Sequence, residues 1–240
     1  MAGTISKDSI QRLLKDVKMI MKNPLTDQGI YYVHSDSDML TGYAMIVGPS
    51  DTPYFGGFYF FKFEFPTDYP HSPPKVLYCT NGQNIRFNPN LYVCGKVCVS
   101  LLNTWSGDQW TSCQTISTVL LTLCTLLCKD PLLNEPGATK SHKDMEPYNN
   151  IIEWANISIA ICDILQKKTG VYLPFFDYFY IYAKEHFLKN YDELIKFSEN
   201  KLSGSKKQTM YSTSFYSMKV CVNYQEIVEK LKQTKEIISN

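Results

Sequence analysis

The segment GGFYFFKFEF, residues 56–65, constrains the fold of this chain more than any other stretch. Two sets of side chains alternate along it, and one set is aromatic throughout: Tyr59, Phe61, Phe63 and Phe65. Alternation with a period of two is typical of an antiparallel strand with one face committed to a core. Turn-forming sequences such as GPSDTPYFGG and PTDYPHSPP separate this strand from three other strand-like segments, at about 29–35, 41–48 and 74–78. Consecutive strands with short links predict an antiparallel meander.

Helical periodicity is found on both sides of the strands. Residues 5–22 carry apolar side chains at helical spacing, and an Asn-Pro pair ends that helix. The apolar period is lost over 78–110, where Asn, Gly and Pro recur, so we expect a long ordered loop with a function. Helical spacing resumes in TSCQTISTVLLTLCTLLC, with Thr111 or Ser112 as the expected N-cap.

The final third of the chain is helical in pattern. Helices are expected at about 148–167, 174–198 and 222–238, with a polar linker, KLSGSKKQ, at 201–208. The order of helix, strands, long loop and further helices predicts an α+β fold.

The composition of the 240 residues excludes some classes of function. A net charge of +1 gives no electrostatic reason for nucleic acid to be the main partner. The first residues lack the apolar core of an export signal, and no apolar run reaches the roughly 18 residues of a membrane span. We therefore expect an intracellular protein, in the cytoplasm or nucleus, whose eight cysteines are free thiols.

Two cysteines, Cys94 and Cys98, lie four residues apart in the loop sequence FNPNLYVCGKVCVSLLNTW. A zinc site would need two further ligands at comparable spacing, and the four histidines do not supply such a pair, so no metal is expected. A cysteine hydrolase would need a histidine base, but His71 and His142 lie in no recognisable protease motif. A thiol that carries an acyl group needs no adjacent base, only an oxyanion stabiliser such as a fixed Asn.

Four motifs in a fixed order resemble the ubiquitin-conjugating (UBC) enzyme family. They are the YPHSPP segment at 69–74, the Asn88-Pro89-Asn90 turn, Cys98, and Trp110 before an apolar helix. Cys98 lies eight residues beyond Asn90, which is the family's spacing from the Asn of its His-Pro-Asn tripeptide to the active-site cysteine. The Asn-Pro-Asn turn, the insertion around Trp105, the NEPG sequence and the long C-terminal extension resemble the ubiquitin-conjugating enzyme Z-like branch.

The resemblance implies a UBC fold over 5–167 and a helical C-terminal extension over 168–240. It implies that Cys98 accepts ubiquitin as a thioester from an activating enzyme and passes it to a lysine of a protein substrate, directly or with a ligase. Asn90 would donate to the oxyanion or hold the loop, and Cys94 would be a bystander. ATP would be consumed upstream by the activating enzyme, so no bound cofactor is expected. A conjugating enzyme for another ubiquitin-like modifier and a catalytically weak UBC-type binding module remain as alternatives.

Several positions depart from the family pattern. Asn88 replaces the usual His, so another hydrogen-bonding group must brace the loop. Ser100 and Asn134 stand where the family keeps acidic residues that position or deprotonate the incoming lysine. Asp108 in the insertion and Glu135 are the candidate substitutes for those acids.

The resemblance also implies partner surfaces. Arg12 and Lys15 align with helix positions that meet the activating enzyme, and a solvated basic face is an equal alternative. His71 occupies a loop position where many members carry a Phe for RING-type ligases. Leu121 and Thr125 align with the helix face that packs against the donor ubiquitin.

Two features concern the other face of the sheet. Tyr31 aligns with a small residue at the centre of a second ubiquitin site, and its bulk is expected to obstruct that contact. The aromatic segment YLPFFDYFYIYAKEHF, 172–187, is expected to pack on the conjugating domain. A docking surface for a modifier or ligase, or a membrane contact, are its alternatives.

Overall fold

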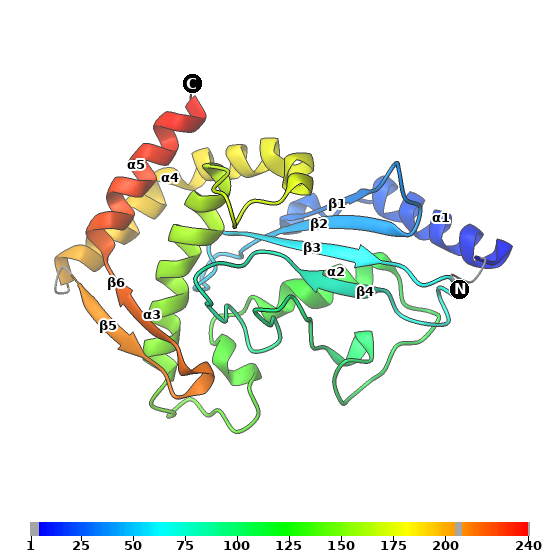
Figure 1. Cartoon of the computed structure of the whole chain (residues 1–240), viewed down its shortest axis with the longest axis horizontal. Helices are drawn as coiled ribbons and strands as arrows, with labels where there is room; N and C mark the ends of the chain where they lie inside the picture. Colours follow the sequence, from blue (N-terminus) through cyan, green and yellow to red (C-terminus); the bar gives the residue numbers. More distant parts are fainter. Residues whose placement is uncertain (1–4, 205–207, 240) are drawn as a thin grey trace.

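The computed structural model describes residues 5–204 and 208–239. Its centre is an antiparallel sheet in the order β1-β2-β3-β4 (Figure 1). The strands are β1 (Ile30–His34), β2 (Thr41–Val47), β3 (Phe58–Glu64) and β4 (Lys75–Tyr78). In the register, Ile30 pairs with Ile46, which in turn pairs with Tyr59. The predicted meander and the α+β class are therefore confirmed.

Both faces of β3 are buried, and here the prediction of one core face was wrong. Phe61 and Phe63 point to one side and are fully buried, but Phe58 and Phe60 on the other side are buried as well. The ring of Phe60 stacks on Phe176 of the C-terminal extension, with 3.8 Å between their centroids. The extension covers this face of the sheet. The alternating side chains of β3 therefore enter two separate buried layers, one on each face, and neither set faces solvent.

Two helices flank the four strands in the sequence: α1 precedes them and α2 follows them, and the two helices contact each other. Helix α1 (Lys7–Lys22) begins at Ser6, whose hydroxyl accepts from the backbone N–H of Ser9. Helix α2 (Ile116–Leu126) begins after Thr115, which forms a capping box with Thr118. The expected N-caps at Thr111 or Ser112 were wrong because only Thr115 has the reciprocal partner three residues later.

The remaining helices lie mainly at one end of the sheet (Figure 1). They are α3 (Met145–Ala155), which continues as a π-helical stretch through Asp163, α4 (Tyr180–Gly204) and α5 (Tyr224–Ser239). The segment Pro174–Phe179 is a 3-10 helix leading into α4. The three helices expected from the pattern are therefore present, with shifted ends.

A short hairpin in the extension was not predicted. Strands β5 (Thr209–Ser212) and β6 (Lys219–Val222) pair with each other and pack against α3 (Figure 1). The expected polar linker at 201–208 was wrong in its first four residues, which continue α4, while 205–207 lie outside the described residues. Four-residue strands are too short to leave a clear alternation, so the hairpin had little signal in the sequence.

Candidate active site

The loop that carries Cys98 folds back on Asn90. The backbone N–H of Cys98 donates to the carbonyl of Asn90 at 2.8 Å, and the side-chain Nδ2 of Asn90 donates to the carbonyl of Cys98 at 2.6 Å. At this spacing of eight residues, Asn90 therefore binds both the backbone N–H and the backbone carbonyl of Cys98. Cys98 itself is 3 % exposed.

Asn90 holds the loop in this state. Its Nδ2 is used by the Cys98 carbonyl, and its Oδ1 is buried without a hydrogen-bond partner among the described residues. The loop-holding role that was left open for Asn90 is thus the one seen in this arrangement. The Nδ2 group carries a second N–H, which makes no hydrogen bond within the described residues and is therefore available to donate to an oxyanion.

Asn88 supplies the brace that the missing His would have given. Its side chain is fully buried, and its Nδ2 donates to the hydroxyl of Tyr54 at 3.0 Å and to the carbonyl of Leu126 at 2.7 Å. Its Oδ1 accepts from the backbone N–H of Asn90 at 2.9 Å. Burial raises the pKa of Tyr54, whose hydroxyl donates in turn to the carbonyl of Phe87. The amide therefore ties the turn to the end of α2 and to the core.

The insertion folds over Ser100. Gly107 has a φ of +127°, and a Cβ there would lie 3.1 Å from the Cβ of Ser100. Thr104 fixes the base of the insertion: its hydroxyl accepts from the N–H of Val99 and donates to the carbonyl of the same residue. Asp108 follows Gly107 in the sequence and is exposed. Thr104 was not identified from the sequence, because a lone Thr in a polar loop carries no signal.

The segment after α2 presents Asn134 and Glu135 differently. Asn134 is exposed, whereas Glu135 is half-buried and accepts a hydrogen bond through Oε2 from the hydroxyl of Tyr216. Tyr216 belongs to the turn between β5 and β6, about 80 residues further along the chain. Sequence reasoning missed this residue because nothing local links it to the loop.

The residues expected to meet partners fall into two groups. Arg12 is engaged within the fold: it donates to the carboxylate of Asp16 and to the carbonyls of Ser112 and Gln114. It therefore fixes the segment before α2 to α1, which is a role that the sequence did not indicate. The other four positions are exposed: Lys15, His71, Leu121 and Thr125.

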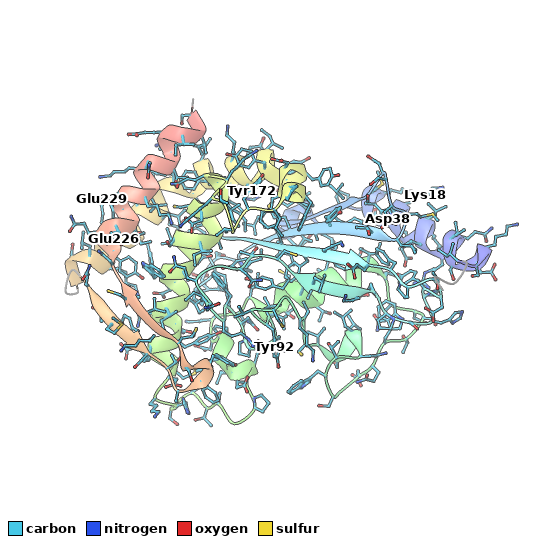
Figure 2. The ribbon with its side chains drawn as sticks, in the orientation of Figure 1. Lys18, Asp38, Tyr92, Tyr172, Glu226 and Glu229 are labelled. Carbon is cyan, nitrogen blue, oxygen red and sulfur yellow. The ribbon has the colours of Figure 1, made fainter. Side chains whose placement is uncertain are left out.

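The face of the sheet that bears Tyr31 is covered by the extension. The ring of Tyr31 stacks on Tyr182 at 4.6 Å between centroids, and its hydroxyl lies 2.7 Å from Nε2 of His186. Tyr43 stacks on Phe175 in the same way. Figure 2 shows Tyr172, at the start of this segment, and Tyr92, in the Cys98 loop, on opposite sides of the sheet.

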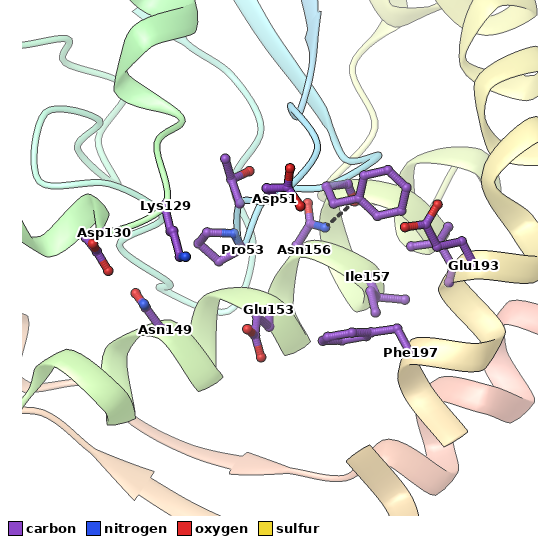
Figure 3. A pocket seen from close by; sticks show the side chains of 13 residues that line it. Asp51, Pro53, Lys129, Asp130, Asn149, Glu153, Asn156, Ile157, Glu193 and Phe197 are labelled. Atoms are coloured by element: carbon purple, nitrogen blue, oxygen red, sulfur yellow. Dashed lines mark hydrogen bonds between the residues drawn. The ribbon is translucent and has the colours of Figure 1, made fainter. Parts of the chain in front are cut away.

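A cavity of about 330 Å³ lies between the β2–β3 turn, α3 and α4 (Figure 3). Several acids line it, including Asp51, Glu153 and Glu193, and Asn156 crosses its floor to donate to the carbonyl of Phe55. None of its lining residues belongs to the Cys98 loop, so it forms no part of the candidate active site.

The described residues offer no cluster of three His, Cys, Asp or Glu side chains that could hold a metal ion. All eight cysteines are free thiols, including Cys94 and Cys98. Among the helices in the described part of the chain, none combines the length and apolar character needed to span a membrane.

Comparison with known proteins agrees with this geometry. The family model described as ubiquitin-conjugating enzyme matches residues 12–155. The chain is 42% identical to ubiquitin-conjugating enzyme E2 Z of Danio rerio over 168 residues, which are 69% of this chain and 51% of that protein. It is 39% identical to the E2 Z of Homo sapiens over 188 residues, 72% of this chain and 52% of that protein. A probable ubiquitin-conjugating enzyme protein 17 of Caenorhabditis elegans is 33% identical over 227 residues, 87% of this chain and 31% of that protein.

The chain thus spans about half the length of the E2 Z proteins that it matches. The matched region contains the Asn88-Pro89-Asn90 turn, Cys98 and the sheet that positions them. Together with the sheet order and the loop geometry, this match shows that the chain belongs to the ubiquitin-conjugating enzyme family.

Proposed function

We propose that this chain is a ubiquitin-conjugating enzyme in which Cys98 carries ubiquitin. The observation that supports it most is the pair of hydrogen bonds between Asn90 and Cys98, which fixes the backbone of the one cysteine at the family's spacing. The insertion packed on Ser100 and the Tyr54–Asn88 brace hold the same loop from other sides. Cys94, in contrast, is exposed, and within the part of the chain that the structure describes no side chain donates to its carbonyl.

The chemistry consists of two acyl transfers. The Cys98 thiolate attacks the thioester carbonyl of ubiquitin on the activating enzyme, and the thiolate of that enzyme leaves. A neutral lysine amine then attacks the Cys98 thioester, an isopeptide bond forms, the Cys98 thiolate leaves, and the amine loses a proton to solvent or a nearby base. Asp108 and Glu135 would orient the lysine ammonium or take its proton, in place of the acids missing at Ser100 and Asn134.

The partners follow from the same proposal. They are ubiquitin, an activating enzyme that consumes ATP, protein substrates and, where used, a ligase, with no cofactor bound to this chain. Leu121 and Thr125 would face the donor ubiquitin, while Lys15 and His71 would face the activating enzyme or a ligase. Arg12, which also fixes the segment before α2 to α1, would face the activating enzyme together with Lys15. Eight free thiols fit work in a reducing compartment, the cytoplasm or nucleus.

A charging assay tests the proposal. The protein is mixed with ubiquitin, activating enzyme and ATP, and then run on a non-reducing gel. We expect a band shifted by one ubiquitin that thiol removes. Cys98→Ser should lack this band, or replace it with a thiol-resistant ester, and Cys94→Ser should retain it. A thiol-sensitive adduct on Cys98→Ser that is lost in Cys94→Ser would overturn the site assignment. Charging by another ubiquitin-like modifier instead of ubiquitin would overturn the choice of modifier.

A further inference from the structure

The turn between β5 and β6 carries Tyr216, whose side chain contacts Glu135 and Arg86. Tyr216 and Ser217 have φ values of 60° and 50°, a backbone conformation that residues other than glycine seldom adopt. The turn is anchored at its start, where the Ser214 hydroxyl and the backbone N–H of Phe215 both donate to one carboxylate oxygen of Asp144, at 2.7 and 2.8 Å. The hydrogen bonds to Asp144 therefore fix the position of the turn that bears Tyr216.

The hydroxyl of Tyr216 holds Glu135. It donates to Oε2, and the Oε1 atom makes no hydrogen bond within the described part of the chain. Burial and the contact with Glu135 raise the pKa of Tyr216 far above its usual value, so the hydroxyl remains a donor at neutral pH. One carboxylate oxygen is thus fixed, and the other is left available beside Asn134.

The ring of Tyr216 supports the Asn-Pro-Asn turn through Arg86. The guanidinium of Arg86 lies 3.4 Å from the centroid of the Tyr92 ring and 4.9 Å from that of Tyr216. It donates to the carbonyl of Asn88 at 3.0 Å and to that of Pro89 at 2.7 Å. A guanidinium held between two aromatic rings is attracted to both faces and presents its donors in a fixed plane. Tyr216 therefore helps to fix the carbonyls of the turn that supplies Asn90.

We propose that Tyr216 is a positioning residue for transfer from Cys98, so that the C-terminal extension forms a working part of the active site. Its hydroxyl orients Glu135, and its ring holds Arg86 against the backbone of the loop. The inference rests on the proposed function, since transfer from Cys98 is the activity that it affects.

Two substitutions separate the two contacts. Tyr216→Phe keeps the ring over Arg86 and removes the hydrogen bond to Glu135, while Tyr216→Leu removes both. Tyr211→Phe is the matched control, because Tyr211 lies on the same hairpin and its hydroxyl makes no hydrogen bond within the described residues. Each purified thioester is followed in single turnover, with discharge to free lysine and hydrolysis by water measured separately. Charging by the activating enzyme is measured alongside.

Tyr216→Phe should slow discharge to lysine about ten- to a hundredfold, the effect of losing one hydrogen bond to a charged group. Hydrolysis and charging should stay within about twofold of the wild type, because neither needs the lysine to be oriented. A general loss of structure would slow all three. The double variant Tyr216→Phe/Glu135→Ala should discharge to lysine no more slowly than Glu135→Ala alone, because both changes remove the same contact. Tyr216→Leu should slow charging as well, since it loosens the turn that bears Asn90.

Hydrogen exchange keeps the inference separate from the proposed function. Amide exchange of the 87–98 segment, measured on the uncharged protein, should be faster in Tyr216→Leu than in the wild type and unchanged in Tyr211→Phe. If no cysteine can be charged, the proposed function fails, and the exchange measurement still decides whether Tyr216 positions the loop. Discharge and exchange that match the wild type in Tyr216→Leu, or equal slowing in Tyr211→Phe, would overturn the inference.

Discussion

Replacing Asn88 with Ala should destabilise the protein by about 3 kcal/mol. The side chain is fully buried and makes three hydrogen bonds, to Tyr54, Leu126 and the backbone of Asn90. Each such bond contributes about 1 kcal/mol net, and its loss leaves the half-buried carbonyl of Leu126 and N–H of Asn90 without these partners. For a chain of this length, a change of that size lowers Tm by roughly 6–12 °C.

A urea titration followed by circular dichroism measures the change. We expect a lower midpoint at an unchanged dependence on urea, which reports a change in the free energy of unfolding alone. Asn200→Ala is the control: Asn200 is exposed on α4 and its side chain makes no hydrogen bond within the described residues, so the substitution should change stability by less than about 0.5 kcal/mol. If Asn88→Ala costs less than about 1 kcal/mol, the Asn88 side chain is not the brace of this loop.

Three other predictions concern burial and packing. In the native protein, iodoacetamide should alkylate the buried Cys98 more slowly than the three exposed thiols, Cys94, Cys113 and Cys221, as measured by peptide mass spectrometry; faster alkylation of Cys98 would contradict its burial. Burial, followed by the charge of Lys189, lowers the pKa of His186. His186 in the folded protein therefore becomes protonated at a lower pH than in the unfolded chain. The free energy of unfolding should be at its full value above about pH 6.5 and should decrease as the pH falls below that value. His186→Gln should flatten that part of a Tm-against-pH curve, and an unchanged slope would refute this assignment. Phe176→Ala should cost about 3–5 kcal/mol in urea unfolding, and a cost below about 1 kcal/mol would mean that the extension does not pack on the sheet.

Local signals in the sequence were sufficient for the sheet and for the candidate nucleophile. The alternation in 56–65 and the turn sequences around it follow from the pleat of a strand and the conformations of Gly and Pro, which are properties of neighbouring residues. The distance from Asn90 to Cys98 is also local, and the structure shows the contacts that this spacing allows. These predictions needed no knowledge of where distant segments would lie.

The predictions that failed depended on contacts between distant segments. Phe60 was expected to point outward, and it is buried because Phe176 of the distant extension stacks on it. Tyr216 reaches Glu135 only because a hairpin of two four-residue strands docks on α3. Side-chain type gives no indication of such partners, because an Arg or a Tyr suits an exposed site and a half-buried one equally well.

The aromatic layer that Tyr31, Tyr43 and Phe60 form with the extension has a consequence for competition. The covering segment is part of the same chain, so it occupies this face at an effective concentration on the order of millimolar or higher. A free partner would have to displace this segment, so its apparent affinity for the face would be lower than its intrinsic affinity. The face thus behaves as a site already filled by a tethered ligand, and cutting the chain after residue 167 would leave Phe60, Tyr43 and Tyr31 to recruit a replacement from solution.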